Sequence, residues 1–220
     1  MKKKIIFSLL AIVFCLTIIG CEKESNEEWE LTSDTARGTI EIVIDEDAAS
    51  SFNDAYKNSK EENLSLVALI GEQVVAGTNY MYLCKSNNNL KVVIVYKDLE
   101  GNSSITSIKD FDLKKYINKD ISMSGEALSG GWYTTIPGKP IMLSEQLQNY
   151  FDTVTEGLVG VSYYPVRVLA TNTDSYAILC YGRVSDANAT EGVYIMTLKV
   201  ENDKPELVSI AAIDLKEFNQ

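Results

Sequence analysis

The sequence contains no histidine, and this absence excludes several classes of functional site. Catalytic triads that use an imidazole base, histidine-ligated metal sites and histidine general acids all need the missing side chain. The chain also has no phosphate-binding loop, no G-x-S-x-G motif and no pair of cysteines at metal-ligand spacing. We therefore expect a protein that is not an enzyme and that uses no cofactor and no metal.

Basic residues are scarce relative to acidic ones, with 20 Lys and Arg against 31 Asp and Glu and a net charge of −11. Removal of residues 1–20, which hold three lysines and no acid, would leave 17 basic and 31 acidic side chains and a net charge of −14. Such a surface repels polyanions, so we expect no nucleic-acid partner and no charge-driven binding to anionic lipid.

The N-terminus has the layout of a secretory signal peptide, with three lysines followed by an apolar stretch from Ile5 to Ile19. This stretch is shorter than the ~20 residues of a membrane-spanning helix. The sequence Ile18-Ile19-Gly20-Cys21 resembles the lipobox of bacterial lipoproteins. The resemblance implies that residues 1–20 are removed, that acyl chains such as palmitate are attached to Cys21, and that the protein is anchored in the cell envelope and faces outward.

The segment after the lipobox, residues 21–36, is acidic and poor in apolar residues, so we expect a flexible tether. The rest of the chain contains an internal repeat. The sequence SIKDFDLKKY, Ser107 to Tyr116, matches SIAAIDLKEF, Ser209 to Phe218, and YMYLC, Tyr80 to Cys84, matches YAILC, Tyr176 to Cys180. We place the first repeat at 37–118 and the second repeat at 119–220.

Two cysteines, Cys84 and Cys180, remain in the repeats, each inside an apolar run. Two cysteines in an exported protein could form a disulfide. These two occupy matching positions of the repeats, however, and equivalent core positions of separate domains lie too far apart to bond. We therefore predict two buried free thiols.

Both repeats show the same order of expected elements, β-α-β-β-β-β. Asp45 is positioned to cap a helix that ends near Ser59, and Ser144 to cap a helix with an apolar stripe that runs from Leu147 to Leu158. Alternating and β-branched patterns predict strands at 39–44, 64–73, 78–85, 90–97 and 104–108, and at 132–136, 161–170, 175–183, 192–200 and 206–213. The expectation is an α+β protein of two domains, each with one helix packed on an antiparallel sheet.

The turn between the second and third strands of the first repeat reads Gln73-Val74-Val75-Ala76-Gly77. This Gln-x-Val-x-Gly hairpin, in this order of elements, resembles the cystatins, which inhibit papain-like cysteine proteases. The resemblance implies two tandem cystatin-like domains and a tip, residues 73–77, that enters the protease cleft. The second repeat has the shorter turn Asn172 to Tyr176 and lacks the motif, so we expect it to be structural or differently specialised.

Two functions remain open at this level. One is a lipid-anchored inhibitor of papain-like cysteine proteases that uses the five residues Gln73 to Gly77. The other is a binding or structural envelope lipoprotein whose hairpin is an ordinary tight turn inherited with the fold. In the first the partner is a protease, whereas in the second the ligand is unknown and could be another surface protein, a polymer or a peptide. In both, the membrane is contacted through the lipid, and the chain is expected to be a monomer.

Overall fold

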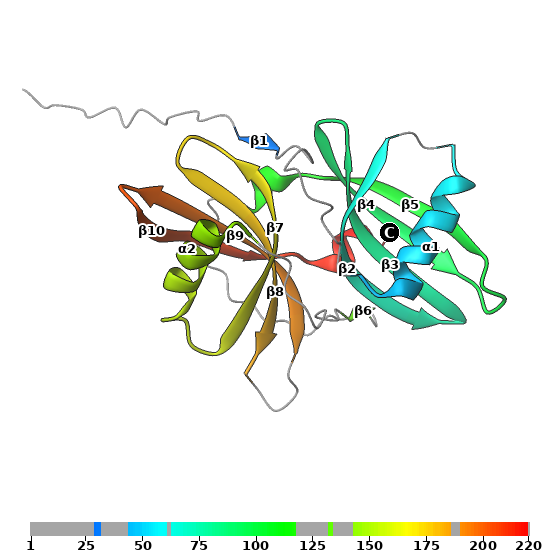
Figure 1. Ribbon diagram of the computed structural model, residues 1–220. Helices are drawn as coiled ribbons and strands as arrows, with labels where there is room; N and C mark the ends of the chain where they lie inside the picture. Colours follow the sequence, from blue (N-terminus) through cyan, green and yellow to red (C-terminus); the bar gives the residue numbers. More distant parts are fainter. Residues whose placement is uncertain are drawn as a thin grey trace, which may run out of the picture.

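The computed structural model describes residues 29–31, 44–60, 63–117, 132–133, 143–185 and 190–219. They form two helices and two five-stranded antiparallel sheets (Figure 1), so the expected α+β class is confirmed. Among these residues no helix is long and apolar enough to cross a membrane.

Each sheet contains the four consecutive strands of one repeat plus one short edge strand. The first sheet has the order β5-β4-β3-β2-β6, made of β2 Leu64–Val75, β3 Gly77–Ser86, β4 Asn89–Lys97, β5 Ser103–Phe111 and β6 Trp132–Tyr133. The second sheet has the order β1-β7-β8-β9-β10, made of β1 Glu30–Leu31, β7 Val161–Thr171, β8 Ser175–Val184, β9 Glu191–Glu201 and β10 Lys204–Ala212. Each end of the eight long strands lies within three residues of its predicted position.

Both helices begin where the capping residues predicted. In α1 (Glu46–Lys57) the Asp45 carboxylate accepts the amide hydrogen of Asp47, and in α2 (Glu145–Thr155) the Ser144 hydroxyl accepts that of Leu147. These bonds satisfy amide groups that have no partner inside the helix. Two short 3-10 helices, η1 (Leu113–Lys115) and η2 (Leu215–Phe218), follow the last strand of each repeat.

The two repeats share a hydrophobic core. The sheets face each other in the middle of the molecule, and α1 and α2 cover their outer faces (Figure 1). Along β3, Met81 and Leu83 point into the shared core, whereas Tyr80, Tyr82 and Cys84 point toward α1. The Tyr181 hydroxyl crosses between the sheets and donates a 2.6 Å hydrogen bond to the Leu69 carbonyl. The repeats therefore stabilise each other and are not independent units.

The short edge strands are exchanged between the repeats. β1 precedes α1 in the chain but pairs with β7 of the second sheet, with Glu30 opposite Thr171. β6 precedes α2 but pairs with β2 of the first sheet, with Trp132 opposite Gln73. The prediction that residues 132–136 begin the sheet of the second repeat is therefore wrong in its pairing. Of that predicted strand only Trp132–Tyr133 is described, and the strand predicted at 39–44 lies outside the described residues except for Ile44.

The segment predicted to be a flexible tether contributes β1 to the second sheet. Trp29 and Leu31 pack against the shared core, which gives the reason for the ordered pairing at this point. Apolar side chains of this size stabilise a contact by roughly 1.5–3 kcal/mol when they are fully buried. Two such residues in an otherwise acidic segment were the signal that the prediction overlooked.

The prediction of two free thiols is confirmed. Cys84 and Cys180 are unpaired and buried, and they lie in different sheets on the faces turned toward α1 and α2. Burial raises the pKa of both thiols, which keeps them protonated and unreactive at neutral pH. Both therefore act as small apolar core residues.

Candidate functional site

Two loops meet at one end of the first sheet. The hairpin of β2 and β3 turns at Ala76, with Val75 opposite Gly77. The loop between β4 and β5 spans residues 98–102. Because Thr78 pairs with Lys97, and Lys97 pairs with Ser103, the two turns lie side by side at the same end of the sheet.

Apolar side chains at this end face solvent. The exposed fraction is 69% for Val74, 46% for Val75 and 81% for Leu99. Within the described residues only two other large apolar side chains, Val159 and Val208, are exposed. We call Val74, Val75, Ala76 and Leu99 together the hairpin edge. Grouped exposed apolar residues of this kind mark interaction sites in soluble proteins.

Gly77 is required by the fold at this position. Its φ angle is +124°, and a Cβ atom placed there would lie 2.3 Å from the Lys97 carbonyl oxygen and 2.9 Å from the Tyr96 ring. The Tyr96 hydroxyl donates a hydrogen bond to the Ala76 carbonyl, which holds the tip against β4. The glycine of the motif thus has a structural reason, whereas Val74 and Val75 belong to none of the hydrophobic core clusters of the described residues.

The Gln73 side chain is engaged inside the sheet. Its amide oxygen accepts a 2.8 Å hydrogen bond from the Asn79 side chain on the neighbouring strand. Its backbone position is paired on both sides, with Asn79 in β3 and Trp132 in β6. Of the five predicted binding residues, Gln73 and Gly77 therefore build the hairpin, and Val74, Val75 and Ala76 present its exposed surface.

The loop that carries Leu99 is held by its own hydrogen bonds. The Asp98 carboxylate accepts 2.7 Å and 2.9 Å bonds from the backbone and side-chain nitrogens of Asn102. The hydrogen bond from the Asn102 side chain contributes most to the lowered pKa of Asp98. Gly101, with a φ of +92°, allows the chain to close the turn. Leu99 is therefore displayed from a fixed loop.

Helix α1 is tied to the same end of the sheet through Asp47. The carboxylate forms an ion pair with Lys97, the β4 residue whose carbonyl oxygen lies against Gly77. It also accepts a 2.8 Å hydrogen bond from the Tyr80 hydroxyl. The bonds from Lys97 and then Tyr80 lower the pKa of Asp47. The pKa of Tyr80 is raised, mainly by burial and secondly by the hydrogen bond to Asp47. This network stiffens the base of the hairpin edge.

Sequence reasoning missed two parts of this site. Leu99 is not among the predicted binding residues, although a single large apolar residue in the polar sequence DLEGNSS was a usable signal. The pairing of Asp47 with Lys97 joins residues 50 positions apart and left no local pattern. Cys21, the predicted lipidation site, lies outside the described residues.

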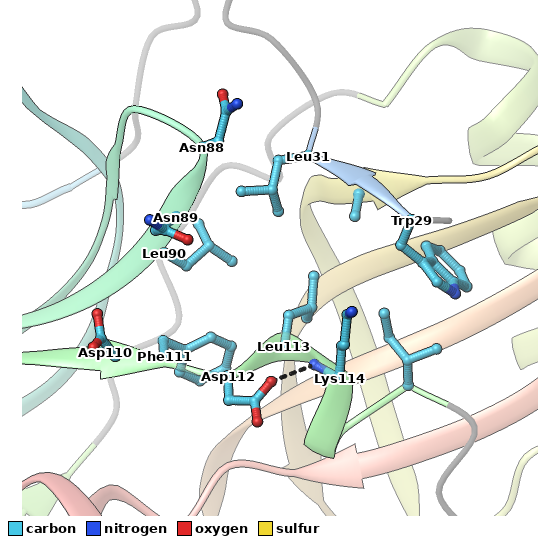
Figure 2. A pocket seen from close by; sticks show the side chains of 12 residues that line it. Trp29, Leu31, Asn88, Asn89, Leu90, Asp110, Phe111, Asp112, Leu113 and Lys114 are labelled. Atoms are coloured by element: carbon cyan, nitrogen blue, oxygen red, sulfur yellow. Dashed lines mark hydrogen bonds between the residues drawn. The ribbon is translucent and has the colours of Figure 1, made fainter. Parts of the chain in front are cut away.

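A pocket of about 390 Å³ lies at the opposite end of the first sheet (Figure 2). Its apolar side chains come from β1, β4, β5, β7, η1 and the residues next to them, namely Trp29, Leu31, Leu90, Phe111, Leu113, Ile117 and Ala170. Asn88, Asn89, Asp110, Asp112 and Lys114 also line it. The Asp112 carboxylate accepts a hydrogen bond from the Lys114 backbone nitrogen, so it serves as the cap of η1. The volume lies within the range of small-ligand pockets.

Within the described part of the chain, no group of three or more Asp, Glu, Cys or His side chains is placed to hold a metal ion. The candidate site is therefore the hairpin edge, with the pocket as a second surface feature. Comparisons with protein-family models, with curated proteins and with solved structures found no match for this chain.

Proposed function

We propose that this protein is an exported, lipid-anchored, cystatin-like binding protein that inserts its hairpin edge into the cleft of a papain-like cysteine protease. In this proposal it acts as a monomer and performs no catalysis. The acyl chains on Cys21 hold it in the bacterial cell envelope. Each repeat supplies one helix packed on one sheet, and the first repeat supplies the binding surface.

The observation that carries the proposal is the exposure of Val74 and Val75 on a tip that is held in place. Burying an exposed valine in a partner cleft contributes about 1.5–3 kcal/mol. The bond from Tyr96 to the Ala76 carbonyl and the tight fit of Gly77 keep the tip in one conformation before binding. A preformed tip loses little conformational entropy when it enters a cleft.

Leu99 extends the same surface. In the cystatin resemblance, the second hairpin carries a Pro-Trp pair that contacts the protease beside the first hairpin. Here the corresponding loop carries Leu99, which is 81% exposed and lies beside the valine tip. An aliphatic side chain at this place supplies less contact area than an indole ring, so we expect a weaker inhibitor than one that carries the full pair.

Titration of a papain-like cysteine protease with soluble protein of residues 22–220 tests the proposal. This fragment keeps β1, which belongs to the second sheet. We expect Val75→Asp to weaken inhibition by about 30-fold or more, the effect of losing about 2 kcal/mol at an interface hot spot. Val159→Asp is the matched control, since Val159 is an equally apolar, 85% exposed residue of the second repeat.

Two results would contradict the proposal. One is full activity of several papain-like proteases in the presence of micromolar folded protein. The other is equal loss of inhibition by Val75→Asp and Val159→Asp, which would point to a general effect of charge. Circular dichroism of each variant shows whether the fold is kept.

The alternative function is that of an envelope lipoprotein that binds a small apolar ligand and inhibits no protease. The pocket lined by Trp29, Leu31 and Leu113 favours it. The chain has two tryptophans, so Trp132→Phe leaves Trp29 as the single reporter. Saturable change of its fluorescence with a medium-chain fatty acid, abolished by Leu113→Arg, would support this function. An unchanged spectrum would count against it.

A further inference from the structure

The position at which the tether enters the fold affects the orientation of the protein on a membrane. β1 is the first described element of the chain, and Trp29 directly precedes it. Trp29 and Leu31 line the pocket together with Asn88 and Asn89, which lie at the turn between β3 and β4. The tether is therefore docked at the end of the first sheet that carries this turn.

The hairpin edge lies at the other end of the same strands. β3 begins at Gly77, at the tip, and ends at Ser86, next to the turn beside which β1 lies. Nine residue steps of about 3.3 Å each separate the two ends by about 30 Å. Figure 1 shows the same arrangement, with β1 beside one end of the first sheet and β6, which pairs next to the tip, at the other.

The tether is short compared with this separation. Cys21 precedes Trp29 by eight residues. At no more than about 3.6 Å per residue, a fully extended tether reaches about 29 Å. With the hairpin edge on the membrane surface, Trp29 would stand about 30 Å above it, so the tether would have to be stretched to its limit. Each residue held extended costs conformational entropy, which disfavours that orientation.

We propose that the pairing of β1 with β7 orients the protein on the membrane, with the β3–β4 turn toward the lipid surface and the hairpin edge away from it. The inference rests on the lipid anchor at Cys21 that is part of the proposed function. Its consequence is that Val74, Val75 and Leu99 are presented to partners outside the membrane, whatever those partners are. The partner on the near side is the lipid surface that holds the acyl chains.

Fluorescence quenching on full-length lipidated protein in phospholipid vesicles tests the orientation. Single cysteines are introduced by Asn88→Cys, near the tether, and by Leu99→Cys, on the hairpin edge, and are labelled with a thiol-reactive fluorophore. Cys84 and Cys180 are buried, so labelling is selective for the new thiol. With a quencher on the lipid headgroups, we expect at least about twice the quenching at position 88 that is seen at position 99. Equal quenching, or stronger quenching at position 99, would overturn the proposal.

A variant that releases β1 separates the role of the strand from that of the anchor. Leu31→Pro removes the Leu31 side chain and its amide hydrogen. Ser25→Pro, four residues after Cys21, alters only the tether upstream of β1 and is the control. We expect the difference in fluorescence quenching between positions 88 and 99 to become smaller in Leu31→Pro and to persist in Ser25→Pro. An undiminished difference in Leu31→Pro would overturn the role of β1.

The experiment also distinguishes this inference from the proposed function. No protease takes part in the quenching measurement, so failure to inhibit a protease leaves its result intact. Retention of a Cys21→Ser variant in the membrane would overturn both the lipid anchor and the orientation. A position-dependent quenching pattern together with an inactive hairpin would support the orientation and reject protease inhibition.

Discussion

The two repeats build equivalent hairpins whose tips differ in polarity. In the first repeat the β2–β3 tip exposes Val74 and Val75. In the second repeat the β7–β8 turn is closed by the Asn172 side chain, which accepts hydrogen bonds of 3.2 Å and 2.8 Å from the amides of Asp174 and Ser175. Since the second repeat folds without exposed valines at this point, the fold does not require them in the first.

The neighbouring loops differ in the same way. In the first repeat the β4–β5 loop exposes Leu99. In the second repeat the corresponding end of the sheet carries ion pairs that join Lys199 to Asp174 and to Glu201, and the hydroxyl of Tyr150 donates to Asp203. One end thus exposes apolar side chains, whereas the other carries charged and hydrogen-bonded ones. The comparison therefore supports the proposal that the first repeat carries the binding surface.

The strongest test of this comparison is to transfer the polar turn. Replacing residues 73–79 with the four residues Asn172 to Ser175 gives the first repeat the turn of the second. We expect inhibition of a papain-like protease to fall at least about 1000-fold, equivalent to about 4 kcal/mol, because the apolar tip is gone. Protease titration measures the loss, and thermal unfolding checks the fold.

A graft that still inhibits within about threefold of the parent would show that the hairpin edge is not the binding surface. Asn172→Ala in the second repeat serves as the control for changes at a hairpin tip, and it should leave inhibition unchanged.

The next largest effect concerns the stability of the tip. We expect Gly77→Ala to lower the free energy of unfolding by about 3 kcal/mol, because the positive φ and the contact with the Lys97 carbonyl both oppose a Cβ. Gly157→Ala, at a site with no heavy atom within 4 Å of the new Cβ, should change it by less than about 1 kcal/mol. Urea unfolding measures both, and similar values for the two variants would refute the structural reason for Gly77.

The bond between the sheets tests whether the repeats act as one unit. Tyr181→Phe leaves the ring in the shared core and removes the hydrogen bond to Leu69, so we expect a loss of about 1–2 kcal/mol in unfolding free energy. Tyr150→Phe removes two exposed hydrogen bonds, one to Asp203 and one from Gln146, and should cost less than about 0.5 kcal/mol. Two separate unfolding transitions in the wild type would contradict a shared core.

The smallest effect is on the titration of Asp47. Its pKa is lowered mainly by Lys97, so the stability from this pair is present at neutral pH and is lost as the pH falls through the lowered pKa. Lys97→Met should raise the pKa of Asp47 and reduce the loss of unfolding free energy as the pH falls. Lys91→Met, which breaks the pair with Asp110, should leave the Asp47 pKa where it is. Carboxyl NMR titration distinguishes the two variants.

Local patterns in the sequence predicted the elements well. Asp45 and Ser144 cap the helices, and the turn residues bound the eight long strands, because caps and turns depend on interactions within a few residues. The internal repeat also placed Cys84 and Cys180 on equivalent buried positions, which the structure confirms. The sequence likewise indicated the hairpin at Gln73 to Gly77, whose tip contributes three of the exposed residues of the candidate site.

Long-range packing was harder to predict. The continuous apolar runs YMYLC and YAILC belong to strands that are buried on both faces, a signal of a second covering layer that the expectation of two separate domains did not use. What covers that second face cannot be deduced from a local pattern, because any apolar surface of suitable shape would do. Only the tertiary structure shows that it is the sheet of the other repeat.

The sequence by itself determined where the two helices begin and where the eight long strands lie, since these depend on hydrogen bonds and side-chain patterns between near neighbours. The tertiary structure decided which strands share a sheet. β1 and β6 are two residues long, so their pairing depends on which edge the fold brings within reach. It also decided that Leu99 stands beside Val74 and Val75, because only the register of β3 on β4 brings the two loops together.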